Sequence, residues 1–151
     1  MNRLLLILTA TVALTLIATG SLFFPPHATA QATSPSKQTS RVHITKGPAL
    51  ESAHDDWAIV TWTSNNPGGS DEHFGVVHYG TDPKNLSQTA KSHIRLNPGH
   101  SYTVFRVRVD GLMPRTTYYY KVDSMDANGK SDGVTCAVKK FTTPSAGDGG
   151  H

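Results

Sequence analysis

The sequence predicts an all-β protein, a seven-stranded antiparallel β-sandwich. Short runs in which apolar and polar residues alternate recur along the chain, as expected for half-buried strands. Turn clusters rich in the 13 Gly and 9 Pro residues separate these runs, and no stretch has a convincing helical period. The runs occupy residues 41–143 of the 151-residue chain, close to the roughly 100 residues of a seven-stranded sandwich. We therefore expect one domain.

The first three expected strands cover residues 41–45, 57–63 and 74–79. The first should be a short edge strand that ends at Gly47-Pro48, because proline cannot donate a ladder hydrogen bond. The second and third have clear alternation, and a polar loop over residues 64–72 separates them. Their expected core residues are Ala58, Val60, Trp62, Val77 and Tyr79. Their expected outward residues include Phe74, Val76 and His78.

Three of the remaining four strands are expected at residues 86–90, 103–110 and 135–142. The first of these is weak and follows a turn over residues 80–83. The second follows Asn97-Pro98-Gly99 and alternates clearly, so that its core residues should be Thr103, Phe105, Val107 and Val109. The third follows a hairpin-type turn over residues 126–129.

The sixth strand belongs to a distinctive stretch over residues 110–122. Leu112 is an apolar anchor, Pro114 suits the first corner position of a turn, and a strand then opens on Tyr118. In that strand one face carries Tyr118, Tyr120 and Val122, and the other carries Tyr119 and Lys121. A tyrosine at this place can bury its ring while its hydroxyl bonds back to the corner.

Charge and cysteine content exclude some classes of function. The formal net charge is +3 and the basic residues do not form a large cluster, so neither nucleic-acid binding nor binding to a membrane surface is expected. Cys136 is the only cysteine, which rules out an intrachain disulfide and a cysteine-based metal site. We expect it to be a partly buried small hydrophobe. An interchain disulfide is the alternative.

Residues 1–30 have the features of a signal peptide. Arg3 precedes an apolar core over residues 4–17, and Ala28-Thr29-Ala30 supplies the small-x-small pattern before Gln31. We expect cleavage after Ala30, a secreted or periplasmic product and no membrane attachment afterwards. An uncleaved membrane anchor over residues 4–24 is the alternative.

Polar residues 31–40 are expected to form a flexible linker, and residues 144–151 a Gly-rich tail.

Several of these motifs resemble a known family. The pattern Gly111-Leu112-x-Pro114-x-Thr116-x-Tyr118-x-Tyr120-x-Val122, together with Trp62, resembles the immunoglobulin-like fibronectin type III fold. The run Val77-His78-Tyr79-Gly80-Thr81-Asp82-Pro83 and the later Phe141-Thr142-Thr143 are similar to the N-terminal domain of purple acid phosphatases. The resemblance covers about residues 41–143. It implies a non-catalytic domain, because that family's metal ligands belong to a separate catalytic domain.

The catalytic motifs of purple acid phosphatases are absent from this sequence, except for a superficial match at Gly147-Asp148-Gly149-Gly150. That match follows no apolar strand, so we expect no catalytic residue there. The best local metal candidate is Asp71-Glu72-His73 with His78. The two histidines should point to opposite faces of a strand, and we expect both to be solvated rather than metal ligands. No metal or other cofactor is expected.

The expected surface for interactions lies on the third and sixth strands. If these strands are neighbours, their outward side chains form one set: Phe74, Val76, His78, Tyr119 and Lys121. The alternative is that the 64–72 loop or the linker covers this face. We expect a monomeric, non-enzymatic docking module for a protein or cell-envelope partner. The alternative function is an accessory N-terminal domain that acts beside a separate metallophosphatase subunit.

Overall fold

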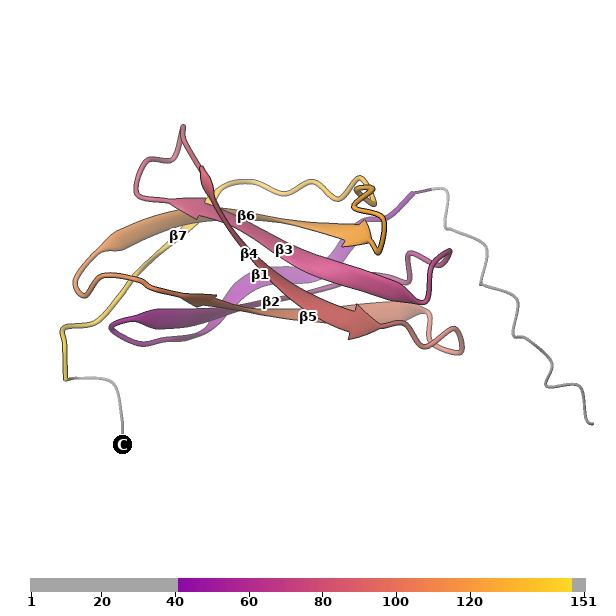
Figure 1. Ribbon diagram of the computed structural model, residues 1–151, viewed down its shortest axis with the longest axis horizontal. Helices are drawn as coiled ribbons and strands as arrows, with labels where there is room; N and C mark the ends of the chain where they lie inside the picture. Colours follow the sequence, from indigo (N-terminus) through magenta and orange to yellow (C-terminus); the bar gives the residue numbers. More distant parts are fainter. Residues whose placement is uncertain (1–40, 148–151) are drawn as a thin grey trace, which may run out of the picture. The chain divides into compact units, whose positions relative to one another are not determined.

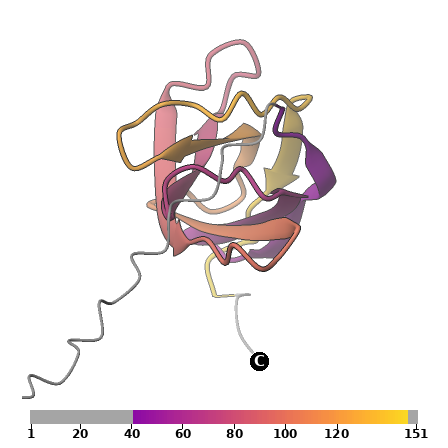
Figure 2. The same cartoon turned by 90° about the vertical axis from the view of Figure 1, so that its right-hand side faces the viewer.

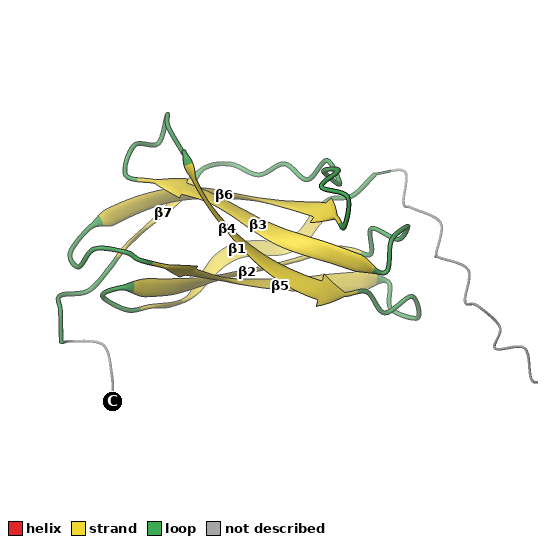
Figure 3. Ribbon diagram, in the orientation of Figure 1, coloured by secondary structure: helices red, strands yellow, loops and turns green. Residues whose placement is uncertain are grey.

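Seven antiparallel strands form two packed sheets in the computed structural model, which describes residues 41–147 (Figures 1 and 3). The strands are β1 (Ile44–Ala53), β2 (Trp57–Asn65), β3 (Glu72–Gly80), β4 (Gln88–Arg95), β5 (Tyr102–Asp110), β6 (Thr117–Asp126) and β7 (Lys139–Thr142). One sheet has the order β1-β2-β5 and the other β4-β3-β6-β7. The predicted all-β sandwich is confirmed.

The core lies between the two sheets, where the inward side chains of alternating strands meet. Its centre is the indole of Trp62 on β2, stacked on the ring of Phe105 on β5 with 5.1 Å between centroids. Gly75 on β3 faces this stack. A Cβ atom there would lie 3.0 Å from atoms of Trp62, Phe105 and Val107, so the strand needs glycine at this point to admit the rings.

The corner before β6 is held by hydrogen bonds from two side chains. Tyr118 is only 3% exposed, and its hydroxyl accepts a 3.0 Å hydrogen bond from the backbone N–H of Met113. The hydroxyl of Thr143, just after β7, donates to the Met113 carbonyl at 2.6 Å and accepts from the Thr116 N–H at 3.0 Å. These bonds join the entry of β6 to the exit of β7.

The first strand is longer than predicted. β1 continues through Gly47-Pro48 to Ala53, because its pairing with β2 shifts register between Lys46 and Ala49. Gly47 adopts a φ of 86° there. A bulge on an edge strand accommodates both the glycine conformation and the missing proline N–H, so the pairing resumes beyond it.

Two other strand boundaries differ from the prediction. β4 begins and ends later than the expected run over residues 86–90, because Ala90, Ser92 and Ile94 form a weakly apolar, half-buried alternation. β7 starts at Lys139 rather than at residue 135. Before it, the Cys136 Sγ accepts a 3.2 Å hydrogen bond from the Val122 N–H, which a strand partner would otherwise bind.

Within residues 41–147, no helix is long and apolar enough to span a membrane. The predicted signal peptide and linker lie outside the described residues, as do residues 148–151 of the predicted tail.

Replacing Tyr118 by phenylalanine should destabilise the domain by about 1 kcal/mol, because the Met113 N–H loses its acceptor while the ring stays in the core. Tyr119→Phe is the matched control, since Tyr119 lies outside the core, and it should change stability by less than about 0.5 kcal/mol. Denaturant unfolding of the two variants measures both values. Equal stability of Tyr118→Phe and the wild type would contradict this account of the corner.

Candidate functional site

The candidate site is the face of the β4-β3-β6-β7 sheet that points away from the core, called here the outer sheet face. β3 and β6 are hydrogen-bonded neighbours, with His78 opposite Lys121 and Gly80 opposite Tyr119. Residues opposite each other in an antiparallel pair share one face. The structure therefore brings the expected surface residues of the two strands onto the same side.

Val76 does not belong to the accessible part of this face. Its exposure is 0%, whereas Phe74, His78 and Tyr119 are partly exposed and Lys121 is exposed. β3 is an interior strand, so the short Val76 side chain has longer ones on both sides, from Lys91 on β4 and Asp123 on β6. The expectation that Val76 offers contact surface is wrong for this reason.

The outer sheet face carries more positive than negative charge. Three exposed lysines lie on it, each on a strand next to an expected surface residue. They are Lys91 opposite Val76, Lys121 opposite His78 and Lys140 opposite Tyr119. None of them takes part in an ion pair within residues 41–147. The ring of Phe74 packs against that of His93 with 5.6 Å between centroids. The partly exposed rings of Phe74 and Tyr119 thus share one surface with the three lysines.

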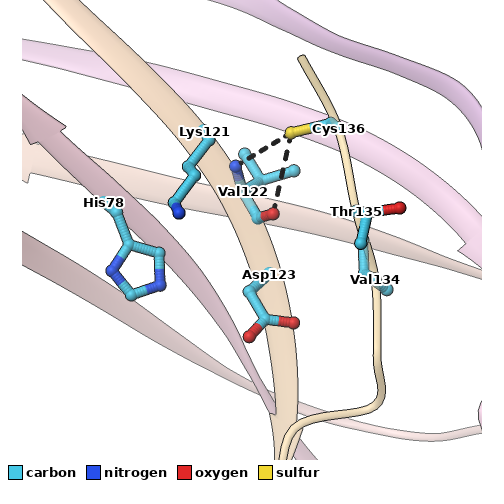
Figure 4. A pocket seen from close by; sticks show the side chains of 7 residues that line it. All are labelled: His78, Lys121, Val122, Asp123, Val134, Thr135 and Cys136. Atoms are coloured by element: carbon cyan, nitrogen blue, oxygen red, sulfur yellow. Dashed lines mark hydrogen bonds between the residues drawn. The ribbon is translucent and has the colours of Figure 1, made fainter. Parts of the chain in front are cut away.

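A shallow pocket of about 170 Å³ borders this face (Figure 4). His78, Lys121 and Asp123 line one side of it, and the segment before β7 lines the other. In Figure 4 the Cys136 thiol turns toward the Val122 backbone, to whose carbonyl its Sγ lies 3.7 Å away. Cys136 is partly buried against the core, as a small hydrophobe would be.

The loops at one end of the sandwich are tied to one another. They are residues 66–71, residues 96–101 and the first part of the 127–138 connection, at the right of Figure 1 and facing the viewer in Figure 2; the rest of that connection runs back along the sandwich to β7. The side-chain amide of Asn66 donates hydrogen bonds to the backbone carbonyls of Asn97 and His100, at 3.0 and 2.9 Å. The Leu96 N–H donates to the Asp71 carbonyl at 2.8 Å. Hydrogen bonds to backbone carbonyls therefore connect the 66–71 loop to the 96–101 loop.

A buried polar cluster joins the third loop to the first. The Nδ1 atom of His73 lies 2.8 Å from Asp132 Oδ2, and its Nε2 lies 3.2 Å from the Gly68 carbonyl oxygen. The Ser124 hydroxyl donates to the same Asp132 oxygen at 2.7 Å. His73 is fully buried, so the expectation that it is solvated is wrong. The 59-residue separation of His73 and Asp132 left no local signal of their pairing.

The charge of Asp132 controls the ionisation of His73. Burial, the largest single influence, lowers the pKa of His73. The hydrogen bond and charge of Asp132, together with smaller effects of the Gly68 carbonyl and the Asp126 charge, overcome this influence and raise the pKa above its usual value. The cluster does not have the order of a catalytic triad, because the carboxylate lies between serine and histidine. Ser124 therefore donates to the carboxylate and has no contact with the imidazole that acts as the base in a triad.

The predicted metal candidate is dispersed in the fold. Asp71 pairs with Arg95 at 3.0 Å, Glu72 lies 3.6 Å from His93, and His73 bonds inward. His78 stays on the outer sheet face, so the two candidate histidines do point to opposite sides. Among residues 41–147, no group of three or more His, Cys, Asp or Glu side chains converges to hold a metal ion.

On the outer face of the β1-β2-β5 sheet, several aromatic and charged side chains contact one another. Trp57 stacks on His54 with 3.8 Å between centroids, and the Arg108 guanidinium lies 4.2 Å from the same ring system. Arg106 binds Glu51 at 2.6 Å. The rings and charges here are engaged with one another, while Tyr102 and Val104 at the start of β5 are about half exposed.

Comparison with known proteins gives one family match. The family model "Purple acid Phosphatase, N-terminal domain" matches residues 39–143, and no curated protein sequence matches. Solved structures with a similar fold include the sensor domain of the anti-sigma factor RsgI4 of Pseudobacteroides cellulosolvens. It is 13% identical in sequence, the match covers 74% of this chain and 95% of that one, and the TM-score is 0.44. A fibronectin type-III domain of human fibronectin type III domain containing protein 3 has 19% identity, coverage of 78% and 99%, and a TM-score of 0.41.

The difference in burial between Val76 and His78 can be tested by truncation. Val76→Ala should destabilise the domain by about 1–2 kcal/mol, because two buried methyl groups are lost. His78→Ala, two residues along the same face, should change stability by less than about 0.5 kcal/mol. Thermal or denaturant unfolding measures both. A Val76→Ala variant as stable as the wild type would mean that this position is accessible.

Proposed function

Because this chain belongs to the family of purple acid phosphatase N-terminal domains, we propose that it is an exported, non-catalytic docking module that binds a protein partner through its outer sheet face. The observation that carries this proposal is the coexistence of Phe74 and Tyr119 on one surface with three exposed lysines that make no ion pair within residues 41–147. Export is supported by the sequence of residues 1–30.

The chemistry of the face indicates the kind of partner. Partly exposed aromatic rings are common anchors at protein interfaces, since they bury a large area and have few rotatable bonds. Lysines around such anchors favour an acidic partner, mainly by raising the rate of encounter and excluding basic surfaces. The expected partner therefore presents an acidic surface with an apolar centre, on a protein of the compartment to which the chain is exported.

A second candidate function follows from the family match over residues 39–143. The chain would then act as an accessory domain beside a separate metallophosphatase subunit, and the outer sheet face would dock on that subunit. The purified chain should not hydrolyse a chromogenic phosphate ester, with or without added iron and zinc. Robust turnover by the pure chain would overturn the proposal that it is not an enzyme.

The docking proposal is tested by capture from the native envelope, followed by binding measurements with the captured partner. Phe74→Ala combined with Tyr119→Ala should lower affinity by about tenfold or more, because interface anchors each contribute more than about 1 kcal/mol. Lys121→Gln should mainly reduce the association rate and its dependence on salt.

Tyr102→Ala combined with Val104→Ala is the control, because it removes exposed apolar side chains from the outer face of the opposite sheet. It should leave binding unchanged. Circular dichroism and the unfolding midpoint establish that both double variants fold. Full binding by the folded Phe74→Ala, Tyr119→Ala protein would end the proposal for this face.

A further inference from the structure

The surroundings of the His73 ring require a proton on each of its nitrogens. Asp132 Oδ2 lies 2.8 Å from Nδ1, and the Gly68 carbonyl lies 3.2 Å from Nε2. Both of these oxygens are acceptors, and a neutral imidazole has only one N–H to donate. A neutral ring would leave one lone pair facing an oxygen inside the fold, whereas the imidazolium satisfies both contacts.

The two contacts of His73 belong to different loops. Gly68 is in the 66–71 loop after β2, and Asp132 is in the long connection from β6 to β7. The Ser124 hydroxyl on β6 holds the same Asp132 oxygen at 2.7 Å, and the Asp132 N–H donates to the Ser124 carbonyl at 2.8 Å. The His73 ring is therefore the bridge between an anchored carboxylate and the 66–71 loop.

We propose that His73 and Asp132 form a pH-sensitive lock, which holds Gly68 of the 66–71 loop when His73 is protonated and releases this contact when His73 becomes neutral. The hydrogen bonds of the Asn66 side chain to Asn97 and His100 stay in place in both states. On deprotonation the Nδ1–H stays on Asp132, because the charged acceptor forms the stronger bond. The Nε2 lone pair then faces the Gly68 carbonyl. The contact with the loop is lost, while the sandwich and its core remain.

The charged groups around His73 determine the direction of the response. Asp132 and, more weakly, the Asp126 charge on β6 favour the imidazolium. On β4, Ile94 lies opposite His73, and the neighbouring His93 and Arg95 are engaged by Glu72 and Asp71. β5, which also packs on β3, contributes neutral inward side chains at this end, Thr103 and Phe105.

The raised pKa of His73 determines the sign of the effect. Relative to the unfolded chain, the stabilisation that protonated His73 gives the fold is fully present below the unfolded value of about 6.5, and it is lost as the pH rises through the higher folded value. The loop should therefore be most firmly held in mildly acidic solution and should loosen under alkaline conditions.

Amide hydrogen exchange of the full chain tests the lock. The amides of Gly68 and Asp132 donate to Asn66 Oδ1 and to the Ser124 carbonyl, so their exchange reports opening of the two loops. From pH 6 to pH 9, and after correction for intrinsic exchange rates, protection at Gly68 should fall by about fivefold, as expected for the loss of one hydrogen bond of about 1 kcal/mol from the His73 ring to the Gly68 carbonyl. Constant protection at Gly68 would overturn the proposal.

Asp132→Asn separates the lock from a general effect of pH. Its amide can donate to Nδ1 of a neutral His73, whose Nε2–H then binds the Gly68 carbonyl, so protection at Gly68 should become independent of pH. His93→Gln removes an exposed histidine from the adjacent strand and should keep the wild-type response. A wild-type pH response in Asp132→Asn would contradict the proposal.

Nitrogen-15 NMR of the wild-type protein measures the protonation of the His73 ring and tests the lock even if Asp132→Asn does not fold. Both ring nitrogens should be protonated at pH 6, and the ring should titrate above pH 6.5. A neutral ring at pH 6 would overturn the lock.

Discussion

The structure depends on one packing constraint, the insertion of the stacked Trp62 and Phe105 rings between the sheets opposite Gly75. The two rings come from adjacent strands of one sheet, and Gly75 lies on a central strand of the other. Because a Cβ atom at Gly75 would lie only 3.0 Å from them, the sheets can approach each other only with glycine at this position. The alternating valines of β2, β3 and β5 then fill the space around the rings.

The two ends of the sandwich are stabilised by different polar interactions. At the corner, the hydroxyls of Tyr118 and Thr143 satisfy backbone groups of Met113. At the loop end, a buried histidine and a carboxylate make the corresponding link. One end of this sandwich is therefore held by hydroxyl groups and the other by a histidine–carboxylate pair.

The two outer faces also differ in how their side chains are used. On the β1-β2-β5 sheet, Trp57 lies against both His54 and Arg108, and Arg106 binds Glu51, so these side chains contact one another, while Tyr102 and Val104 stay about half exposed. On the outer sheet face the lysines make no ion pairs within residues 41–147. This asymmetry, rather than the number of aromatic residues, is what favours the outer sheet face as the surface for a partner.

The sequence by itself determined the fold class and the inward residues of the strong strands, because the alternation of Ala58, Val60 and Trp62 and the Leu112–Tyr118 corner are local patterns. It also identified Phe74, Tyr119 and Lys121 as outward residues. Tertiary structure alone decided that Val76 is buried and that His73 bonds to Asp132. Both outcomes depend on which strands and loops lie beside β3, and those neighbours are distant in sequence. The bulge that carries β1 past Gly47-Pro48 likewise required the partner strand, since register is a property of a pair.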